Sequence, residues 1–277
     1  MGITLSNHNH LTHKDQDQDP RIHMAITIYN SYKIGFHTSK LPKLADSIRI
    51  LADYSRPYQI FLGNPQSAKI SISDEDIALS TRIVNITGAN IFVHSPYIIN
   101  LCNPPSWQIT SLRKNLEYSS SIGFKGVVVH VGKLCGKYTS TDGITNMRNN
   151  IISLLHYASP DCPLILETPA GQGTETLTDI DQFIDFILSI DDSRFGFCID
   201  TCHTFASGYC PFSYIQRCLH TPLIQPKLKI VHFNDSKTPC GSKKDRHEYI
   251  GMGHIGIGKM GDIAELCHSN HIPMVVE

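Results

Sequence analysis

Residues 163–203 are PLILETPAGQGTETLTDIDQFIDFILSIDDSRFGFCIDTCH. Two apolar runs in this stretch, PLILE and FGFCID, have the length of buried parallel strands. Between them, LTDIDQFIDFILSI has apolar residues at helical spacing, and Thr178 with the acidic residues that follow it is typical of a helix start. The stretch therefore predicts a strand–helix–strand unit, from which parallel sheets are built.

The same unit repeats along the chain. Short apolar runs recur along the chain, and most steps between their ends are roughly 25 to 37 residues, the size of one strand–helix unit; the last step, from His232 to Glu277, is the longest. They are YKIGFH (32–37), YQIFL (58–62), NIFVH (90–94), GVVVHV (126–131), PLILE (163–167), FGFCID (195–200), KIVHF (229–233) and IPMVVE (272–277). Helix-like patterns lie between them, for example at 41–55 and 106–123. Eight strands alternating with helices predict an α/β fold, a (β/α)₈ TIM barrel, and an open doubly wound sheet is the alternative.

Length and composition fit one such domain. The chain has 277 residues, of which 41% are hydrophobic. Residues 1–30 are polar and without period, which predicts a flexible N-terminal extension, and residues 31–277 would form the barrel. Residues 236–258 are rich in Gly, Lys and Asp, and we expect them to form a long functional loop. The nine cysteines contain no CxxC pair and are expected to be mostly buried thiols.

Charge and targeting signals narrow the class of protein. The sequence has no apolar run of membrane-helix length and no signal-peptide pattern near its start, so we expect an intracellular protein. The formal net charge is −1 with histidines neutral. An enzyme that acts on nucleic acid with a net charge this close to zero must concentrate positive charge on one part of its surface.

Most of the predicted strands end in a side chain that can bind a metal ion. A barrel brings the C-terminal ends of its strands to one face, so these side chains should converge. Buried charged groups at such positions are costly unless they are paired or bind metal. The six strand-end residues are His94, His130, Glu167, Asp200, His232 and Glu277.

Three further candidates follow these strand ends. His203 lies three residues after Asp200, and Asp245 with His247 forms a DRH triplet in the expected long loop. Imidazole and carboxylate ligands favour zinc, with manganese or iron as alternatives. Nine ligands suit two or three ions. Three dications with the four carboxylates would keep about two positive charges, which suits a phosphate substrate.

The longest motifs resemble those of endonuclease IV, the family of zinc-dependent abasic-site (AP) endonucleases. They run in order along the chain: HSPYIINLCNP (94–104), VVVHVGK (127–133), ILETPAGQG (165–173), FCIDTCHTFASGY (197–209), HFNDSKTPCGSKKDRH (232–247) and GMGHIG (251–256). The resemblance implies a monomeric TIM barrel with three zinc ions, with manganese as an option at one site. It implies base excision repair of double-stranded DNA: hydrolysis 5′ to abasic sites, giving 3′-hydroxyl and 5′-deoxyribose phosphate ends, and trimming of blocked 3′ ends.

The resemblance also groups the ligands. His94, His130 and Glu167 would hold one zinc, and Glu167 would bridge to a second. Asp200, His232 and Glu277 would complete the second site. His203, Asp245 and His247 would hold the third ion. In this scheme Glu167 is the catalytic carboxylate, because the two ions it joins would share the hydroxide that attacks phosphorus.

Several other residues are candidates for binding DNA. Tyr97 matches a position that packs near the flipped-out abasic nucleotide, and Asn64 lies on a loop that resembles the DNA-penetrating loop. Gln66 departs from the family, which often has a basic residue there. His37 matches no ligand and is expected to be hydrogen-bonded near the site. Candidate phosphate contacts are Lys133, Lys137, Lys237, Lys243, Lys244 and Arg246.

Two departures from the family remain. The polar extension is absent from the family's core pattern, and the sequence stops at Glu277, where family members continue with a loop and a final helix. We therefore expect one flank of the barrel to lack its usual cover. Two other functions are kept as alternatives: a sugar or sugar-phosphate isomerase of the related xylose isomerase-like barrels, and a non-catalytic damage-binding protein.

Overall fold

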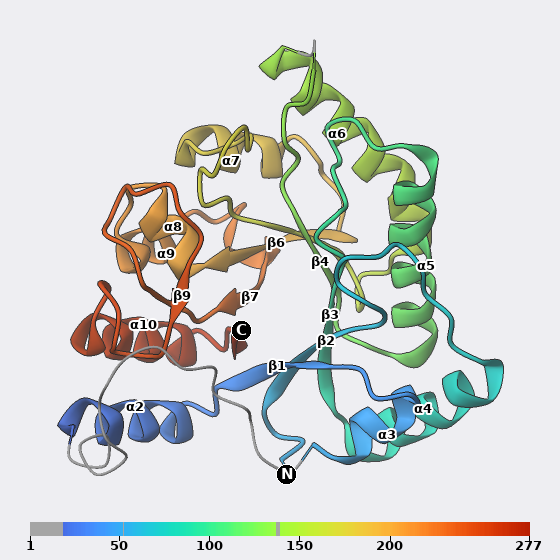
Figure 1. Cartoon of the computed structure of the whole chain (residues 1–277), viewed down its shortest axis with the longest axis horizontal. Helices are drawn as coiled ribbons and strands as arrows, with labels where there is room; N and C mark the ends of the chain where they lie inside the picture. Colours follow the sequence, from blue (N-terminus) through green and yellow to red (C-terminus); the bar gives the residue numbers. More distant parts are fainter. Residues whose placement is uncertain (1–18, 52, 137–138) are drawn as a thin grey trace.

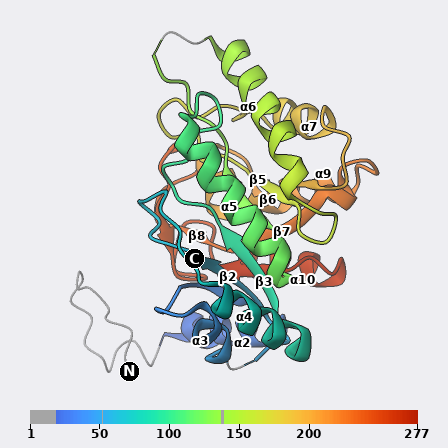
Figure 2. The same ribbon diagram turned by 90° about the vertical axis from the view of Figure 1, so that its right-hand side faces the viewer.

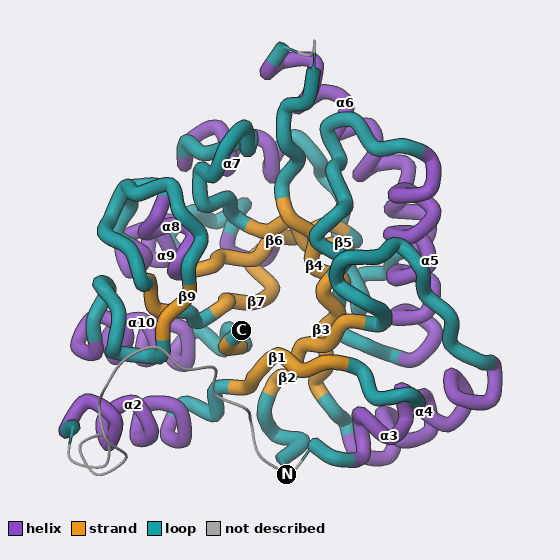
Figure 3. The backbone as a smooth tube through the Cα atoms, viewed as in Figure 1, coloured by secondary structure: helices purple, strands orange, loops and turns teal. Residues whose placement is uncertain are grey.

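Eight parallel strands close into a barrel in the computed structural model, which describes residues 19–51, 53–136 and 139–277. Figures 1 and 3 show the ring of strands with the helices outside it. The order around the ring is β1-β10-β7-β6-β5-β4-β3-β2. The strands are β1 (Gly35–Ser39), β2 (Pro57–Phe61), β3 (Asn90–His94), β4 (Val127–His130), β5 (Leu164–Glu167), β6 (Phe195–Asp200), β7 (Leu228–His232) and β10 (Met274–Val276).

Helices connect consecutive strands and cover the outside of the barrel; α5 and α6 are seen along its flank in Figure 2. A short antiparallel pair, β8 (Asp235–Ser236) with β9 (His247–Glu248), follows β7. The α-helices are α2 (Pro20–Ser31), α3 (Leu44–Arg49), α4 (Asp74–Thr87), α5 (Ser106–Ile122), α6 (Ser140–Leu154), α7 (Ile180–Leu188), α8 (Thr201–Ala206), α9 (Pro211–Leu219) and α10 (Ile257–Ser269). The predicted TIM barrel is confirmed.

Two predicted elements differ in their bounds. The first strand begins at Gly35, because α2 extends to Ser31 and Lys33 then adopts a left-handed conformation with φ 49°. The helical pattern at 41–55 yields only α3, which ends at Arg49. Asp53 then forms a turn in which its carboxylate accepts the backbone N–H and hydroxyl of Ser55. Side-chain acceptors of this kind compete with the helix backbone.

The second part of the expected N-terminal extension is helical. Residues 1–18 lie outside the described residues, but α2 begins directly after Asp19, whose side chain accepts the N–H of Arg21. Pro20 takes the first helical position, where no N–H is needed. Tyr32, at the end of the helix, donates from its hydroxyl to Glu265 of α10 at 2.6 Å. Figure 1 shows α2 beside α10, so a helix from before β1 covers part of the flank expected to be bare.

The interior of the barrel is filled by one small apolar layer. It is formed by Phe92, Val128, Ile165, Cys198, Ile230 and Val275, all at most 3% exposed. Six of the nine cysteines are buried, as expected. Among the described residues, no helix combines the length and apolarity needed to cross a membrane.

Candidate metal centre

Each residue of the interior apolar layer is followed, two positions later, by one of the six predicted strand-end ligands. Successive strand side chains alternate between the two faces, so a residue and the second one after it point to the same side. The barrel interior therefore carries an apolar layer and, one step nearer the C-terminal mouth, a polar layer. The polar layer is His94, His130, Glu167, Asp200, His232 and Glu277.

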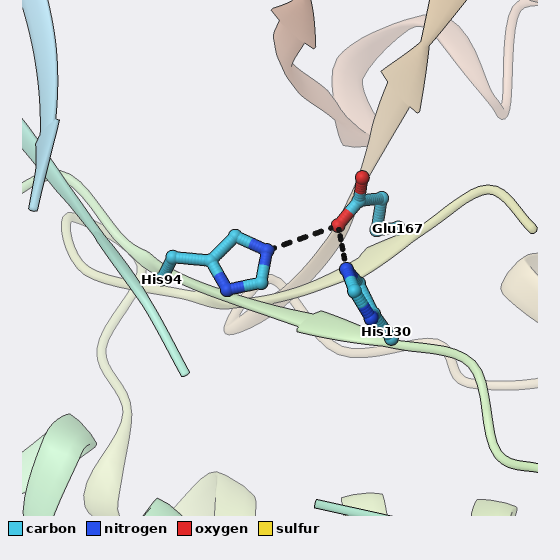
Figure 4. A group of neighbouring side chains, drawn as sticks. All are labelled: His94, His130 and Glu167. Carbon is cyan, nitrogen blue, oxygen red and sulfur yellow. Dashed lines mark hydrogen bonds and ion pairs between the residues drawn. The ribbon is translucent and has the colours of Figure 1, made fainter. Parts of the chain in front are cut away.

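The first group of ligands is His94, His130 and Glu167. Figure 4 shows both imidazoles pointing at the same carboxylate oxygen. The Nε2 atoms of His94 and His130 lie 3.2 and 3.1 Å from Oε2 of Glu167. The Nδ1–H of His94 donates to the carbonyl of Ser95 at 2.7 Å, which leaves Nε2 free to bind an ion.

Glu167 faces two groups at once. Its Oε2 atom meets the first group, whereas its Oε1 atom lies 3.0 Å from Nδ1 of His232. The carboxylate is 1% exposed. One side chain thus presents an oxygen to each of two neighbouring groups.

The second group surrounds Nδ1 of His232. Besides Glu167, this nitrogen lies 3.2 Å from Oε2 of Glu277 and 3.8 Å from Oδ2 of Asp200. The backbone N–H of Glu277 donates to the side chain of Asn234 at 2.9 Å, and the amide of Asn234 donates to Asp200 at 2.7 Å. Asn234, two residues after the strand-end His232, therefore holds two candidate ligands in place. Its role was not predicted from the sequence, because an Asn two residues past a strand end carries no distinctive pattern.

The third group is built from α8 and the β8–β9 segment. Oδ1 of Asp245 lies 3.3 Å from Nε2 of His203 and 3.1 Å from Nε2 of His247. His203 lies in the first turn of α8, the helix that follows β6, and its other nitrogen donates to the carbonyl of Thr168 at 2.9 Å. The structure thus brings the DRH triplet to the barrel mouth. Cys202, which the sequence did not mark as a candidate ligand, also lies close enough to Asp200 and His247 to share an ion with them.

In this cluster, the pKa values of Glu167 and His203 are shifted by the opposite charges of their neighbours. Burial alone would raise the pKa of Glu167, but the nearby His130 and His232 hold it well below its usual value. Burial would likewise lower the pKa of His203, but Asp200 and Asp245 raise it well above 6.5. Buried ionisable groups whose pKa values are strongly shifted by neighbouring charges are typical of functional sites.

The residues fit metal ions. Within each of the three groups, the ligand atoms lie within 4.8 Å of one another. Nε2 of His247 is buried and forms no hydrogen bond with the described residues, although the carboxylates of Asp245 and Asp200 lie near it. A buried nitrogen without a hydrogen-bond partner is costly unless something else satisfies it. Imidazole and carboxylate are the ligands expected of zinc without cysteine.

The aromatic candidate for binding DNA lies at the mouth. The ring of Tyr97 is 54% exposed and stacks on His130 with centroids 5.7 Å apart. Asn64 is exposed on the loop after β2, and its side chain accepts the N–H of Gln66. The carbonyl of Pro65 accepts the N–H of Tyr97 at 2.9 Å, so this loop and the tyrosine are held together.

The basic candidates fall into two sets. Lys133 is engaged by Glu175, with 3.4 Å between Nζ and the carboxylate, and Lys137 lies outside the described residues. The others are exposed on the segment between β8 and β9 and form no ion pair with any described residue. They are Lys237, Lys243, Lys244 and Arg246.

The comparisons with known proteins agree with this architecture. Residues 42–265 match the family model described as "Xylose isomerase-like TIM barrel", which defines the class of the protein. The chain is 32% identical over 257 residues to a protein of Symbiobacterium thermophilum named "Probable endonuclease 4", covering 88% of this chain and 92% of the relative. A protein of the same name from Geobacillus kaustophilus is 33% identical over 88% of this chain and 86% of its own length. The chain belongs to the endonuclease 4 family, and it is an enzyme of the endonuclease class.

Solved structures show the same fold. Endonuclease IV from Thermus thermophilus superimposes with a TM-score of 0.76 at 22% identity, over 88% of this chain and 91% of that structure. A D-tagatose 3-epimerase-like protein gives a TM-score of 0.68 at 16% identity. At these identities the likeness concerns the fold alone, and it extends to proteins of different chemistry.

Proposed function

We propose that this endonuclease hydrolyses the phosphodiester on the 5′ side of abasic sites in double-stranded DNA, leaving 3′-hydroxyl and 5′-deoxyribose phosphate ends, and that it also trims blocked 3′ ends. The observation that carries the proposal is the cluster of three adjacent ligand groups at the barrel mouth, with both oxygens of Glu167 directed at different groups. The names of the relatives supply the endonuclease class.

Three zinc ions would be held by nine ligands. His94, His130 and Glu167 would hold the first, and Glu167 would bridge to the second. The second would be completed by Asp200, His232 and Glu277, and His203, Asp245 and His247 would hold the third, with manganese as an option at one site. Bound ions would supply activation of water and neutralisation of charge on the phosphate.

The chain's own residues would position these ligands and exclude solvent. Asn234 keeps Asp200 and Glu277 aligned, and the apolar layer beneath closes the barrel interior. Tyr97, stacked on His130 at the rim, would pack against the exposed abasic nucleotide, and Asn64 would approach the DNA on the neighbouring loop. Hydrolysis would need no side-chain general base.

The cations near β9, which have no ion-pair partner in the described part of the chain, would bind the DNA backbone. Lys237 and Arg246 are joined through their backbones, because the N–H of Lys237 donates to the carbonyl of Arg246 at 2.8 Å. Together with Lys243 and Lys244 they form a local positive rim on a chain whose formal net charge is only −1. Such phosphate contacts would make binding of DNA fall with rising salt. We further propose that the protein acts as a monomer inside the cell.

The decisive experiment uses a labelled duplex with one tetrahydrofuran analogue of an abasic site. A lyase cannot cut this analogue by β-elimination, so a 3′-hydroxyl product reports hydrolysis. We expect the metal-loaded protein to cut on the 5′ side of the analogue. If the loaded protein instead isomerised sugars and left the duplex intact, the alternative isomerase function would replace the proposal.

The variant Glu167→Gln tests the role of the carboxylate shared by the first two ligand groups. It keeps the size of the side chain but removes the charge and one of two acceptor oxygens, so at most one of the two groups keeps an oxygen ligand, and that oxygen is uncharged. Loss of a residue that only supports a metal ligand typically lowers metal affinity or activity by about 10- to 100-fold. Loss of a ligand shared by two ions should therefore lower cleavage by more than about 100-fold. Cleavage at the wild-type rate by this variant would refute the role of Glu167.

A further inference from the structure

Gln59 is a fully buried amide in the middle of an otherwise apolar strand. It lies in β2, whose residues are all buried, and it is 0% exposed. Its side chain points into the barrel beside the polar layer and contacts three other polar side chains. A buried amide costs free energy unless its oxygen and its N–H groups are all satisfied. Here both ends of the amide meet candidate ligands.

The oxygen of the amide determines which nitrogen of His232 faces the ions. Oε1 of Gln59 lies 2.9 Å from Nε2 of His232. An amide oxygen only accepts, so Nε2 must carry the proton of this hydrogen bond. The opposite nitrogen, Nδ1, is the atom that faces Glu167 and Glu277. Its lone pair is then available for an ion.

The nitrogen of the same amide orients Glu277. Nε2 of Gln59 donates to Oε1 of Glu277 at 2.6 Å, which leaves Oε2 facing Nδ1 of His232 at 3.2 Å. Nδ1 of His37 lies 3.1 Å from both Gln59 Nε2 and Glu277 Oε1 and encloses the pair from the other side. The amide of Gln59 thus accepts a hydrogen bond from His232 and donates one to Glu277. An ionised carboxylate could only accept, and an apolar side chain could do neither.

We propose that Gln59 is a positioning residue for the second ligand group: it holds His232 and Glu277 so that Nδ1 and Oε2 face a common ion. The inference rests on the proposed function only for the presence of that ion. Groups that fix ligands in this way tune metal affinity although they never touch the metal.

The test replaces Gln59 by methionine, which keeps the length of the side chain but removes the amide. Gln108→Met is the matched control. Gln108 is also a buried glutamine, and its amide donates to the carbonyl of Ile98 and accepts the N–H of Asn100, away from the candidate ligands. Zinc affinity is measured by competition with a chelator. We expect one class of zinc to bind about 10- to 100-fold more weakly in Gln59→Met and no change in the control.

A spectroscopic readout separates positioning from general damage. In zinc-loaded protein with ¹⁵N-labelled histidine, we expect His232 to bind through Nδ1 and to keep a slowly exchanging proton on Nε2. In Gln59→Met that proton should exchange rapidly, because its acceptor is gone. Wild-type zinc affinity together with an unchanged Nε2 proton in Gln59→Met would overturn the proposal.

Gln59→Glu provides a second variant in case the methionine protein folds poorly. Its carboxylate can still accept from His232 but repels Glu277, so the Nε2 proton should remain protected while zinc affinity falls. Full affinity in this variant would contradict the role at Glu277. Neither readout depends on DNA cleavage. Failure of the duplex assay with unchanged zinc results would therefore refute the proposed function and leave the inference about Gln59 standing.

Discussion

The two ring nitrogens of His203 face different partners. Its Nδ1 donates to the carbonyl of Thr168, and its Nε2 faces Asp245 at 3.3 Å. Burial would lower its pKa, but Asp200 and Asp245 raise the pKa well above 6.5. Below this raised pKa the ring is a cation and repels a metal ion, and above it the ring is neutral and can bind one. An ion in the third group must therefore displace a proton at neutral pH.

This competition predicts a pH dependence of metal binding. The apparent zinc affinity of the third group should rise with pH, by up to about tenfold per unit for each proton released, until the pKa of His203 is passed. It can be measured by competition titrations in metal-buffered solutions from about pH 6 to pH 8, with proton release followed in parallel. An affinity that stays constant over this range would show that His203 carries no proton in the metal-free protein.

At the level of elements, the segment after β7 is organised by a buried carboxylate. Asp235 is 0% exposed, and Oδ2 accepts the N–H groups of Gly251 and Gly253 at 3.0 and 3.1 Å. Its Oδ1 accepts the N–H of Ile255 at 2.9 Å. A Cβ atom at Gly253 would lie 2.4 Å from a backbone oxygen, so this turn requires glycine. The carboxylate thus ties the loop before α10 to β8, and β8 pairs with β9, which carries His247.

Asp235→Asn should loosen this loop. The new NH₂ group would face backbone N–H donors, leaving buried groups unsatisfied, at a cost of about 2–4 kcal/mol in the free energy of unfolding. Chemical denaturation measures the cost, and hydrogen exchange should show faster exchange at residues 251–256. Asp262→Asn, at an exposed position of α10, is the control and should change stability by less than about 0.5 kcal/mol. Equal effects of the two substitutions would contradict this account.

Arg56, the residue before β2, contacts the C-terminal end of helix α2. The guanidinium of Arg56 donates to the carbonyls of Tyr29 and Ile34 at 3.0 and 2.8 Å and to the side chain of Asn30 at 3.0 Å. It also lies 4.8 Å from the centre of the Tyr29 ring, a cation–π contact. Arg56 therefore holds the C-terminal end of α2 against the barrel.

Arg56→Met should release α2 while the barrel remains folded. We expect a loss of about 2 kcal/mol, because two backbone acceptors lose a charged donor. Hydrogen exchange should accelerate in residues 20–31 more than in the central strands. Arg49→Met is the control, since Arg49 is exposed and, among the residues that the structure describes, pairs only with Asp46. If residues 20–31 kept their protection in Arg56→Met, the helix would be held by its contacts with α10 alone.

For the whole molecule, the candidate ligands connect parts of the barrel that are far apart in sequence. They come from β3, β4, β5, β6 and β7, from α8, from the β9 segment and from the residue after β10. Metal ions bound there would hold strands together across the ring. Because unfolding scatters the ligands, such binding adds directly to the stability of the native state.

Removal of metal should therefore destabilise the entire fold. Each ion present at about 1,000 times its Kd adds about 4 kcal/mol, so a chelator should lower Tm markedly, and renewed zinc should restore it. Thermal unfolding with and without chelator measures the shift. An unchanged Tm would indicate that the three groups hold no tightly bound ion under those conditions.

The sequence by itself determined the barrel and the positions of its strand ends. Apolar runs such as NIFVH and FGFCID each end in a charged or imidazole side chain, and the strands β3 to β7 end where the pattern predicted. Burial and alternation are local properties, so they are visible along the chain. The helix α2 was not predicted, although Asp19 and Pro20 form a helix-start signal, because the polar composition of residues 1–30 indicated a flexible extension.

Only the tertiary structure decided how these residues combine. That Glu167 divides its oxygens between two groups, that Gln59 joins His232 to Glu277, and that α2 packs beside α10 all depend on contacts between distant segments. Gln59 and Glu277 are 218 positions apart. A periodic pattern shows which face of a strand a side chain occupies, but only closure of the ring determines which side chain lies opposite and which of its atoms points there.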